Sequence, residues 1–214
     1  MGMLDPRTLR VYVVTSGTLV AGRGHGAIAS AAVRGGATAV QLRAPELEDE
    51  ELAPLASAVF RVCDEAGVPL VVNDRVEVAV ASGASGAHVG QDDDPRAARE
   101  RLGPDRILGV SVSGEDEARD AEAAGADYLG VTVWASATKP EAVPIGLDGL
   151  RRVAGATALP VVGIGGIDAA NAREVIEAGA AGIAVIRAVA TAEDPVLAVR
   201  ELRASVDRFT EETG

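Results

Sequence analysis

Eight short apolar runs alternate with alanine-rich, charged segments from one end of the chain to the other. The runs predict β-strands at 11–14, 39–42, 69–72, 87–89, 107–110, 127–131, 160–163 and 181–185. The segments beside them have helical character and cover 25–34, 48–66, 75–82, 95–102, 114–124, 147–153, 168–178 and 194–209. Strand–helix alternation with short connections implies parallel strands joined by right-handed crossovers. Eight such units predict an α/β fold, a closed (β/α)₈ TIM barrel.

A glycine–alanine pair recurs in phase with this alternation. It occurs at 35–37, 83–85, 125–127 and 179–181, each time after a predicted helix and before the next strand. Glycine at this place can end a helix in the left-handed conformation, and alanine allows the helix to approach the sheet closely. Chance in an alanine-rich chain explains one such pair but poorly explains four, so the repeat favours the barrel.

The length and composition fit one aliphatic core. Barrels of this class run to about 200–250 residues as one unit, so we expect residues 1–214 to form a single domain. Hydrophobic residues make up 48% of the chain but aromatic residues only 2%, which is typical of parallel strands filled by branched aliphatic side chains. The one cysteine, Cys63, excludes a disulfide framework and a cysteine metal cage.

The charge balance narrows the class of partner. Twenty Lys and Arg against 32 Asp and Glu give a net charge of −12, which argues against nucleic acid and anionic membranes. Small anions fit only where local donors and a divalent cation outweigh this field. The first ten residues contain no apolar stretch of signal-peptide length, and no run reaches the roughly 18 apolar residues that span a bilayer. We therefore expect a cytoplasmic protein.

Polar side chains follow the predicted strands, at the barrel end where this fold carries its chemistry. In chain order they are Gln41, Arg43, Asn73, Asp74, Gln91, Asp92, Asp93, Asp94, Ser111, Ser113, Ser136, Thr138 and Lys139. Carboxylates after adjacent strands favour a Mg²⁺ site, because Mg²⁺ binds one or two carboxylates together with waters and phosphate oxygens. The alternatives are that Asp74 caps the helix near Arg75 and that the later acids start the helix at Pro95.

A glycine-rich turn, residues 163–167 (GIGGI), follows the seventh strand and leads into a helix. The loops after strands seven and eight are the usual phosphate cradle of this fold, where backbone N–H groups approach an anion. A tight structural turn is the alternative. The position after the seventh strand, with Ile186 and Arg187 ending the eighth, favours phosphate binding.

Histidine chemistry is poorly supported. His88 lies inside a predicted strand, which is more typical of a satisfied interior histidine than of a base, and His25 is expected to start the first helix. Trp134 either forms a wall of the pocket or packs under its loop. With two histidines in the chain, no Ser-His-Asp or Cys-His arrangement is indicated.

Segments spread in order over nearly the whole chain match a known family. They are VQLR (40–43), VVNDRVEVA (71–79), AHVGQDD (87–93), LGVSV (108–112), ADYLGV (126–131), ATKP (137–140), VVGIGGI (161–167) and GIAVIRAV (182–189). Any one segment is unspecific, whereas the ordered set is highly specific. The sequence resembles thiamine-phosphate synthase and its relatives in the TenI group.

The resemblance implies a transferase that joins hydroxymethylpyrimidine diphosphate to thiazole phosphate, forming thiamine phosphate and releasing pyrophosphate. It implies that Asp74 and Asp93 bind Mg²⁺, that Gln41, Arg43, Asn73 and Lys139 hold the pyrimidine diphosphate with Ser111 beside the reacting centre, and that Ser136, Thr138, Gly166, Ile186 and Arg187 surround the thiazole phosphate. Ser111, Lys139 and Arg43 are the implied catalytic residues. Catalysis is then chiefly electrostatic and positional, because the metal and the cations stabilise the leaving pyrophosphate.

Two positions depart from the family pattern. The family reads Gln-Leu-Arg-Glu-Lys after the second strand, but this chain has QLRAP, so Pro45 stands where the lysine would contact the leaving group. Arg187 stands where serine is frequent. The thiazole tautomerase of the TenI branch uses a histidine after the fifth strand, where this chain has Ser113.

These residues favour a synthase over two alternatives. One is a divergent TenI-like enzyme, and the other is a non-catalytic regulatory module that binds a phosphorylated ligand, which the missing lysine keeps open. The oligomeric state is not readable from the sequence, and a homo-oligomer is compatible with it.

Overall fold

The computed structural model describes residues 4–17, 20, 22–136, 138 and 142–213. Eight strands form a closed, all-parallel barrel in chain order, with β1 paired to both β2 and β8. They are β1 (Val11–Val14), β2 (Ala39–Leu42), β3 (Leu70–Asn73), β4 (Gly86–Val89), β5 (Ile107–Ser111), β6 (Tyr128–Thr132), β7 (Val161–Ile164) and β8 (Gly182–Val185). The predicted (β/α)₈ barrel is confirmed.

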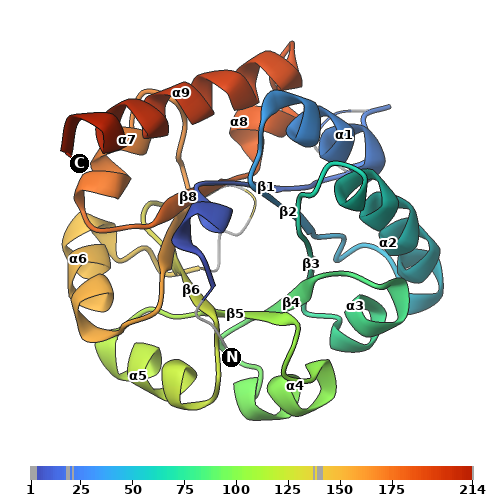
Figure 1. Ribbon diagram of the computed structural model, residues 1–214, viewed down its shortest axis with the longest axis horizontal. Helices are drawn as coiled ribbons and strands as arrows, with labels where there is room; N and C mark the ends of the chain where they lie inside the picture. The colour runs from blue at the N-terminus through green and yellow to red at the C-terminus, as the bar shows by residue number, and fades with distance from the viewer. Residues whose placement is uncertain (1–3, 18–19, 21, 137, 139–141, 214) are drawn as a thin grey trace.

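Helices form an outer ring around the strands (Figure 1). They are α1 (His25–Gly35), α2 (Asp49–Asp64), α3 (Val76–Ser82), α4 (Pro95–Leu102), α5 (Glu115–Ala123), α6 (Gly146–Ala156), α7 (Ala172–Glu177), α8 (Arg187–Ala190) and α9 (Pro195–Thr213), with a short 3₁₀ helix η1 (Pro6–Leu9) before β1. The glycines of the predicted repeat, Gly36, Gly83, Gly125 and Gly179, all have positive φ, between 80° and 99°. They turn the chain from a helix toward the next strand, as the repeat predicts.

Every predicted strand bound lies within one residue of the observed one, whereas the helices differ more: α6 ends three residues and α9 four residues later than predicted. The helices η1 and α8 were not predicted, because four-residue helices leave almost no periodic signal. The prediction that a helix starts at residue 168 is wrong by four residues. The Asp168 carboxylate accepts hydrogen bonds from the backbone N–H groups of Ala170 and Asn171, at 2.8 and 3.3 Å, which holds a turn before α7 begins.

The core has two layers. Aliphatic side chains between strands and helices form the larger one, which also contains the buried Cys63, whose pKa burial raises to about 11. The smaller layer fills the barrel and includes Leu9, Tyr12, Val14, Val71, Tyr128 and Val162. The chain contains two tyrosines, and both lie inside the barrel. Their rings meet edge to face with centroids 5.9 Å apart, so they fill the interior that a chain poor in aromatics otherwise fills with small side chains.

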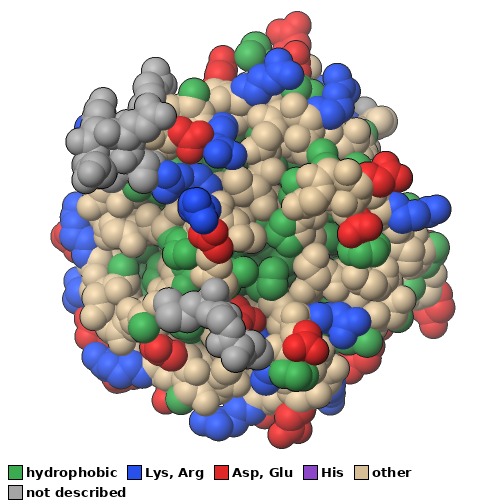
Figure 2. Space-filling view, viewed as in Figure 1, with side chains coloured by type: hydrophobic (Ala, Val, Ile, Leu, Met, Phe, Trp, Pro, Cys, Tyr) green, Lys and Arg blue, Asp and Glu red, His purple; other side chains and the backbone are tan. Residues whose placement is uncertain are grey.

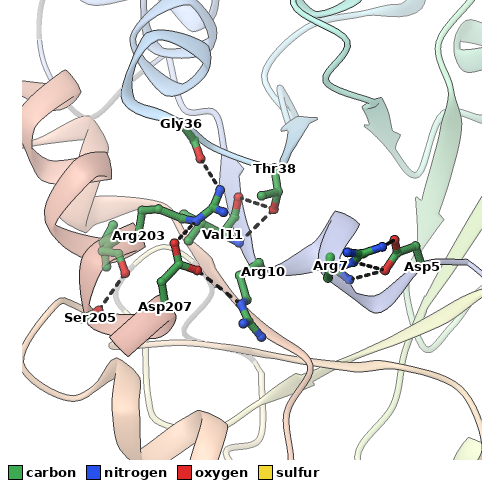
Figure 3. A network of polar contacts seen from close by, with 10 residues as sticks. Asp5, Arg7, Arg10, Val11, Gly36, Thr38, Arg203, Ser205 and Asp207 are labelled. Carbon is green, nitrogen blue, oxygen red and sulfur yellow. Dashed lines mark hydrogen bonds and ion pairs between the residues drawn. The ribbon is translucent and has the colours of Figure 1, made fainter. Parts of the chain in front are cut away.

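Helix α9 closes the ring of helices between α7 and α1, and its later residues reach the N-terminal end of the strands. Its Asp207 lies 3.5 Å from Arg10 Nε, just before β1, and also binds Arg203, which donates to the carbonyl of Gly36 at 3.3 Å (Figure 3). At this end η1 lies over the middle of the barrel (Figure 1), with Leu9 only 1% exposed. Acidic and basic side chains are intermixed over this face, and some apolar side chains lie among them near its middle (Figure 2). Across the part of the chain described, no helix combines the length and the apolar character that crossing a bilayer requires.

Candidate functional site

A pocket of about 460 Å³ opens at the C-terminal ends of the strands. Nine residues predicted from the sequence line it: Gln41, Arg43, Asn73, Ser111, Ser136, Thr138, Gly166, Ile186 and Arg187. They come from β2, β3 and β5, from the loops after β2, β6, β7 and β8, and from the first residue of α8, so residues far apart in sequence meet in one cavity. Lys139 lies outside the described residues.

Neither of the two predicted metal ligands lines this pocket. Asp74 directly follows β3, and its φ of 61° is the one positive value among the described non-glycine residues. Its backbone N–H donates to the carbonyl of His88 at 2.8 Å, which fixes the end of β3 against β4. Such a backbone conformation is uncommon outside glycine, although Asp tolerates it, and it occurs often at functional sites.

The alternative that Asp74 caps a helix is wrong, because Arg75 is the N-cap residue of α3 and no side chain caps that helix. The helix-start alternative holds for Asp94, whose side chain accepts from the backbone N–H of Arg96 at the start of α4. Asp93 instead accepts a hydrogen bond from the backbone N–H of Gly90 at 2.8 Å. Within the run of three aspartates, Asp94 therefore caps α4, whereas Asp93 holds the loop after β4.

The donor set determines what this region can bind. No group of three or more His, Cys, Asp or Glu side chains within the described part of the chain could hold a metal ion by itself. Asp74 and Asp93 provide two carboxylates from the loops after adjacent strands. Two hard oxygen donors suit Mg²⁺, which completes its coordination with waters and substrate phosphate oxygens.

A chain of hydrogen bonds crosses the floor of the pocket. Gln41 Nε2 donates to the Tyr12 hydroxyl, the two tyrosine hydroxyls are bonded, the Tyr128 hydroxyl meets His88 Nδ1, and His88 Nε2 meets Ser111 Oγ; each distance is 2.9 Å. Burial raises the pKa of both tyrosines, so they remain neutral phenols.

Sequence reasoning missed three members of this floor: Tyr12, His88 and Tyr128. His88 is hydrogen-bonded at both ring nitrogens, as expected of an interior histidine, but it also lines the pocket. The available signal was a pair of glycines on the next two strands, Gly109 on β5 and Gly130 on β6. A Cβ at Gly109 would lie 2.4 Å from His88 Nδ1, and a Cβ at Gly130 would lie 3.0 Å from His88 Cε1. The ring occupies space that those two glycines leave empty.

The glycine-rich turn forms another wall. Gly165 and Gly166 have φ of 98° and 63°, and a Cβ at Gly165 would lie 2.2 Å from the Trp134 carbonyl oxygen. The Asn171 side chain donates to the carbonyl of Gly166 at 2.9 Å, which holds the turn. Facing it, the Ser136 and Thr138 hydroxyls are 2.8 Å apart. The short helix α8, after β8, stands where phosphate sites of this fold place an extra helix.

Arg43 is positioned by the loops before it. Its backbone N–H donates to Thr15 Oγ1 at 3.2 Å, and Thr15 Oγ1 is 2.8 Å from His25 Nδ1. His25, the first residue of α1, is 2.9 Å from the Glu46 carboxylate through Nε2. Burial alone would raise the pKa of Glu46, but hydrogen bonding to His25 and the nearby Arg43 charge bring it below its usual value. This cluster joins the loops after β1 and β2.

Comparisons with known proteins show which family this chain resembles. The family model described as thiamine monophosphate synthase matches residues 11–189. The thiamine-phosphate synthases of Chloroflexus aurantiacus and Moorella thermoacetica are 50% and 48% identical, over 92% of this chain and 92% and 96% of their own. A solved structure, thiamine phosphate pyrophosphorylase from Pyrococcus furiosus, has 38% identity and a TM-score of 0.88, covering 95% of this chain and 98% of that one.

Proposed function

The chain belongs to the thiamine monophosphate synthase family, and from this premise we propose that it couples hydroxymethylpyrimidine diphosphate with thiazole phosphate, giving thiamine phosphate and pyrophosphate. The observation that carries the proposal is the convergence of nine predicted substrate-binding positions on one pocket. The proposal extends to residues 1–214 acting as one catalytic domain in the cytoplasm.

The pyrimidine diphosphate occupies the side of the pocket formed by the ends of β2, β3 and β5. Gln41, Arg43 and Asn73 hold it there, with Ser111 beside the reacting carbon and Lys139 as a further cation. Asp74 and Asp93 would hold Mg²⁺, which would supply positive charge to the diphosphate. An arginine fork binds phosphate oxygens with two parallel hydrogen bonds, so Arg43 orients the leaving group as well as attracting it.

The thiazole phosphate occupies the opposite side. Ser136 and Thr138 offer hydroxyl groups, and Gly166, Ile186 and Arg187 offer backbone N–H groups to its phosphate. The bond from the pyrimidine methylene to the diphosphate oxygen breaks, and the thiazole nitrogen then forms a bond to that methylene. The apolar side chains of Val162, Ile164 and Ala184 exclude water from the cation-like centre, which favours capture by the thiazole.

Of the two alternatives, the TenI-like tautomerase loses its support, and the non-catalytic module keeps one observation in its favour. Ser113, at the position of the tautomerase histidine, does not line the pocket, and its backbone N–H and hydroxyl both bond to Glu117. The non-catalytic module remains the second candidate because Pro45 is exposed, lies outside the pocket lining and brings no charge to the leaving group.

A turnover assay with both family substrates, with and without Mg²⁺, tests the proposal. Formation of thiamine phosphate and pyrophosphate in equal amounts, only with Mg²⁺, supports the synthase. Tight binding of thiazole phosphate without any turnover supports the non-catalytic module instead.

A further inference from the structure

The hydrogen-bond chain on the pocket floor has a direction, and the Gln41 side chain sets it. Its Nε2 atom carries only donors, so the bond of 2.9 Å to Tyr12 uses one lone pair of the Tyr12 oxygen. Tyr12 is 1% exposed, and its remaining partner in the described hydrogen bonds is the Tyr128 hydroxyl. If Tyr128 donated to Tyr12, the hydrogen of Tyr12 would be buried without an acceptor, which is unfavourable. Tyr12 therefore donates to Tyr128.

The next two bonds follow from that assignment. The Tyr128 oxygen accepts from Tyr12, so its own hydrogen is directed to His88 Nδ1, 2.9 Å away. A ring nitrogen that accepts a hydrogen bond carries no proton, and a neutral imidazole then carries its proton on the other nitrogen. His88 Nε2–H donates to Ser111 Oγ at 2.9 Å.

The packing keeps the ring in this orientation. The His88 and Tyr128 rings lie with centroids 5.4 Å apart and planes tilted by 33°. Gly109 on β5 and Gly130 on β6 have no side chain that could separate the His88 ring from Tyr128 and Ser111. The bonds therefore act on a histidine whose place is already fixed by the barrel.

We infer that His88 is a positioning residue held as the Nε2–H tautomer, which occupies a lone pair of Ser111 Oγ and leaves the Ser111 hydrogen to be donated to the substrate. The role of Ser111 toward the diphosphate substrate rests on the proposed function, whereas the tautomer of His88 does not. A hydroxyl whose oxygen already accepts a hydrogen bond is a better donor, because bonds in such chains polarise one another. Donation to an oxygen that gains negative charge stabilises the transition state more than the ground state.

The tautomer can be read directly. The chain contains two histidines, so a long-range ¹H–¹⁵N spectrum of protein labelled in histidine shows two rings, and the His88→Gln variant identifies one of them. At neutral pH the His88 ring is expected to carry its proton on Nε2. A proton on Nδ1 alone overturns the inference, because the hydrogen bonds would then run in the opposite direction. A proton on both nitrogens also overturns it, because Nδ1 would then not accept from Tyr128.

Two tyrosine variants make a matched pair. Tyr128→Phe removes the donor to Nδ1, so the fraction of His88 in the Nε2–H form should fall. Tyr12→Phe removes one hydroxyl from the same aromatic pair but leaves Tyr128 able to donate to His88, so the Nε2–H form should persist. An unchanged His88 signal in Tyr128→Phe contradicts the assignment.

Kinetics test whether His88 acts through Ser111. His88→Phe should lower kcat about tenfold at unchanged KM, the effect of one lost hydrogen bond in the transition state. In a Ser111→Ala background the same substitution should lower kcat no further. Equal losses in both backgrounds, accompanied by a parallel fall in melting temperature, assign His88 a merely structural role and overturn the inference. Absence of turnover in the wild type refutes the proposed function, and the spectrum still decides the tautomer.

Discussion

The two ends of the barrel are built in opposite ways from the same strands. At the N-terminal end, Leu9 plugs the barrel, and Asp207 of α9 joins Arg10 to Arg203 (Figure 3). At the C-terminal end the barrel opens into a pocket whose floor is a chain of polar side chains. The difference shows where this fold places stability and where it places chemistry. Substitutions at the N-terminal end should change the melting temperature without changing turnover. Substitutions at the C-terminal end should change turnover without changing the melting temperature.

The largest expected effect concerns the metal. Asp74→Ala and Asp93→Ala should each lower Mg²⁺-dependent turnover by at least about a hundredfold. The proposed Mg²⁺ would offset the negative charge that develops on the leaving pyrophosphate, and each variant removes one of its ligands. Asp74→Asn removes the same charge with a residue that, unlike alanine, tolerates a φ of 61°, so its melting temperature should change little. Asp92→Ala changes a neighbouring exposed acid and should keep its activity. Full activity in both ligand variants would remove the metal assignment.

A change in the opposite direction is expected at Pro45. Wild-type turnover should be low, and Pro45→Lys should raise kcat about ten- to a hundredfold, the value of a charge-assisted contact of about 1.5–3 kcal/mol realised in the transition state. Steady-state kinetics of both proteins at saturating Mg²⁺ measure this, provided that the loop tolerates the loss of proline's fixed φ. Brisk wild-type turnover that the substitution leaves unchanged means that another cation, Arg43 or Lys139, already supplies the charge.

A smaller effect is expected at the phosphate wall. Gly166→Val adds bulk where the anion must approach, at a φ of 63° that a β-branched residue rarely adopts. Affinity for thiazole phosphate, measured by calorimetry, should fall about tenfold, which is about 1.4 kcal/mol. Affinity for the pyrimidine diphosphate should change little. Gly155→Val, at an exposed helical glycine with open space around it, serves as the comparison and should leave both affinities unchanged. Unchanged thiazole-phosphate affinity in Gly166→Val would refute the assignment of the glycine-rich turn to phosphate binding.

The smallest effect belongs to the closed end. Asp207→Asn removes the charge that Arg10 and Arg203 share, and for a partly exposed pair this is worth about 0.5–1 kcal/mol. The melting temperature should fall by about 1–4 °C, with kcat unchanged. Asp148→Asn, in an exposed pair with Arg151, should not shift melting. A loss of turnover in Asp207→Asn would mean that the two ends are coupled.

The same contrast separates what the sequence could predict from what it could not. Strand positions follow from runs of apolar residues, and β1 and β2 were predicted with the bounds they have. Residues after strands, such as Arg43 and Ser111, were predicted to meet because all parallel strands end on one side. These features depend on chain order, and order is fully present in a sequence.

Features that depend on register were not predicted. Whether Tyr12 and Tyr128 point into the barrel or toward the helices depends on how neighbouring strands are staggered, and a sequence does not show the stagger. His88 was interpreted as a buried side chain because its strand gave no sign that β5 and β6 carry glycines opposite it. The floor of the pocket is therefore visible only in the assembled barrel.

Trp134 packs behind the phosphate wall, and the chain contains no second tryptophan. Its Cβ lies 3.4 Å from where a Cβ at Gly166 would be, and its carbonyl stands against Gly165. Indole fluorescence of the whole protein therefore originates at one wall of one pocket, and the closed end of the barrel contributes none of it. Binding of thiazole phosphate at the proposed site should therefore change the native emission of an unlabelled and unmodified chain.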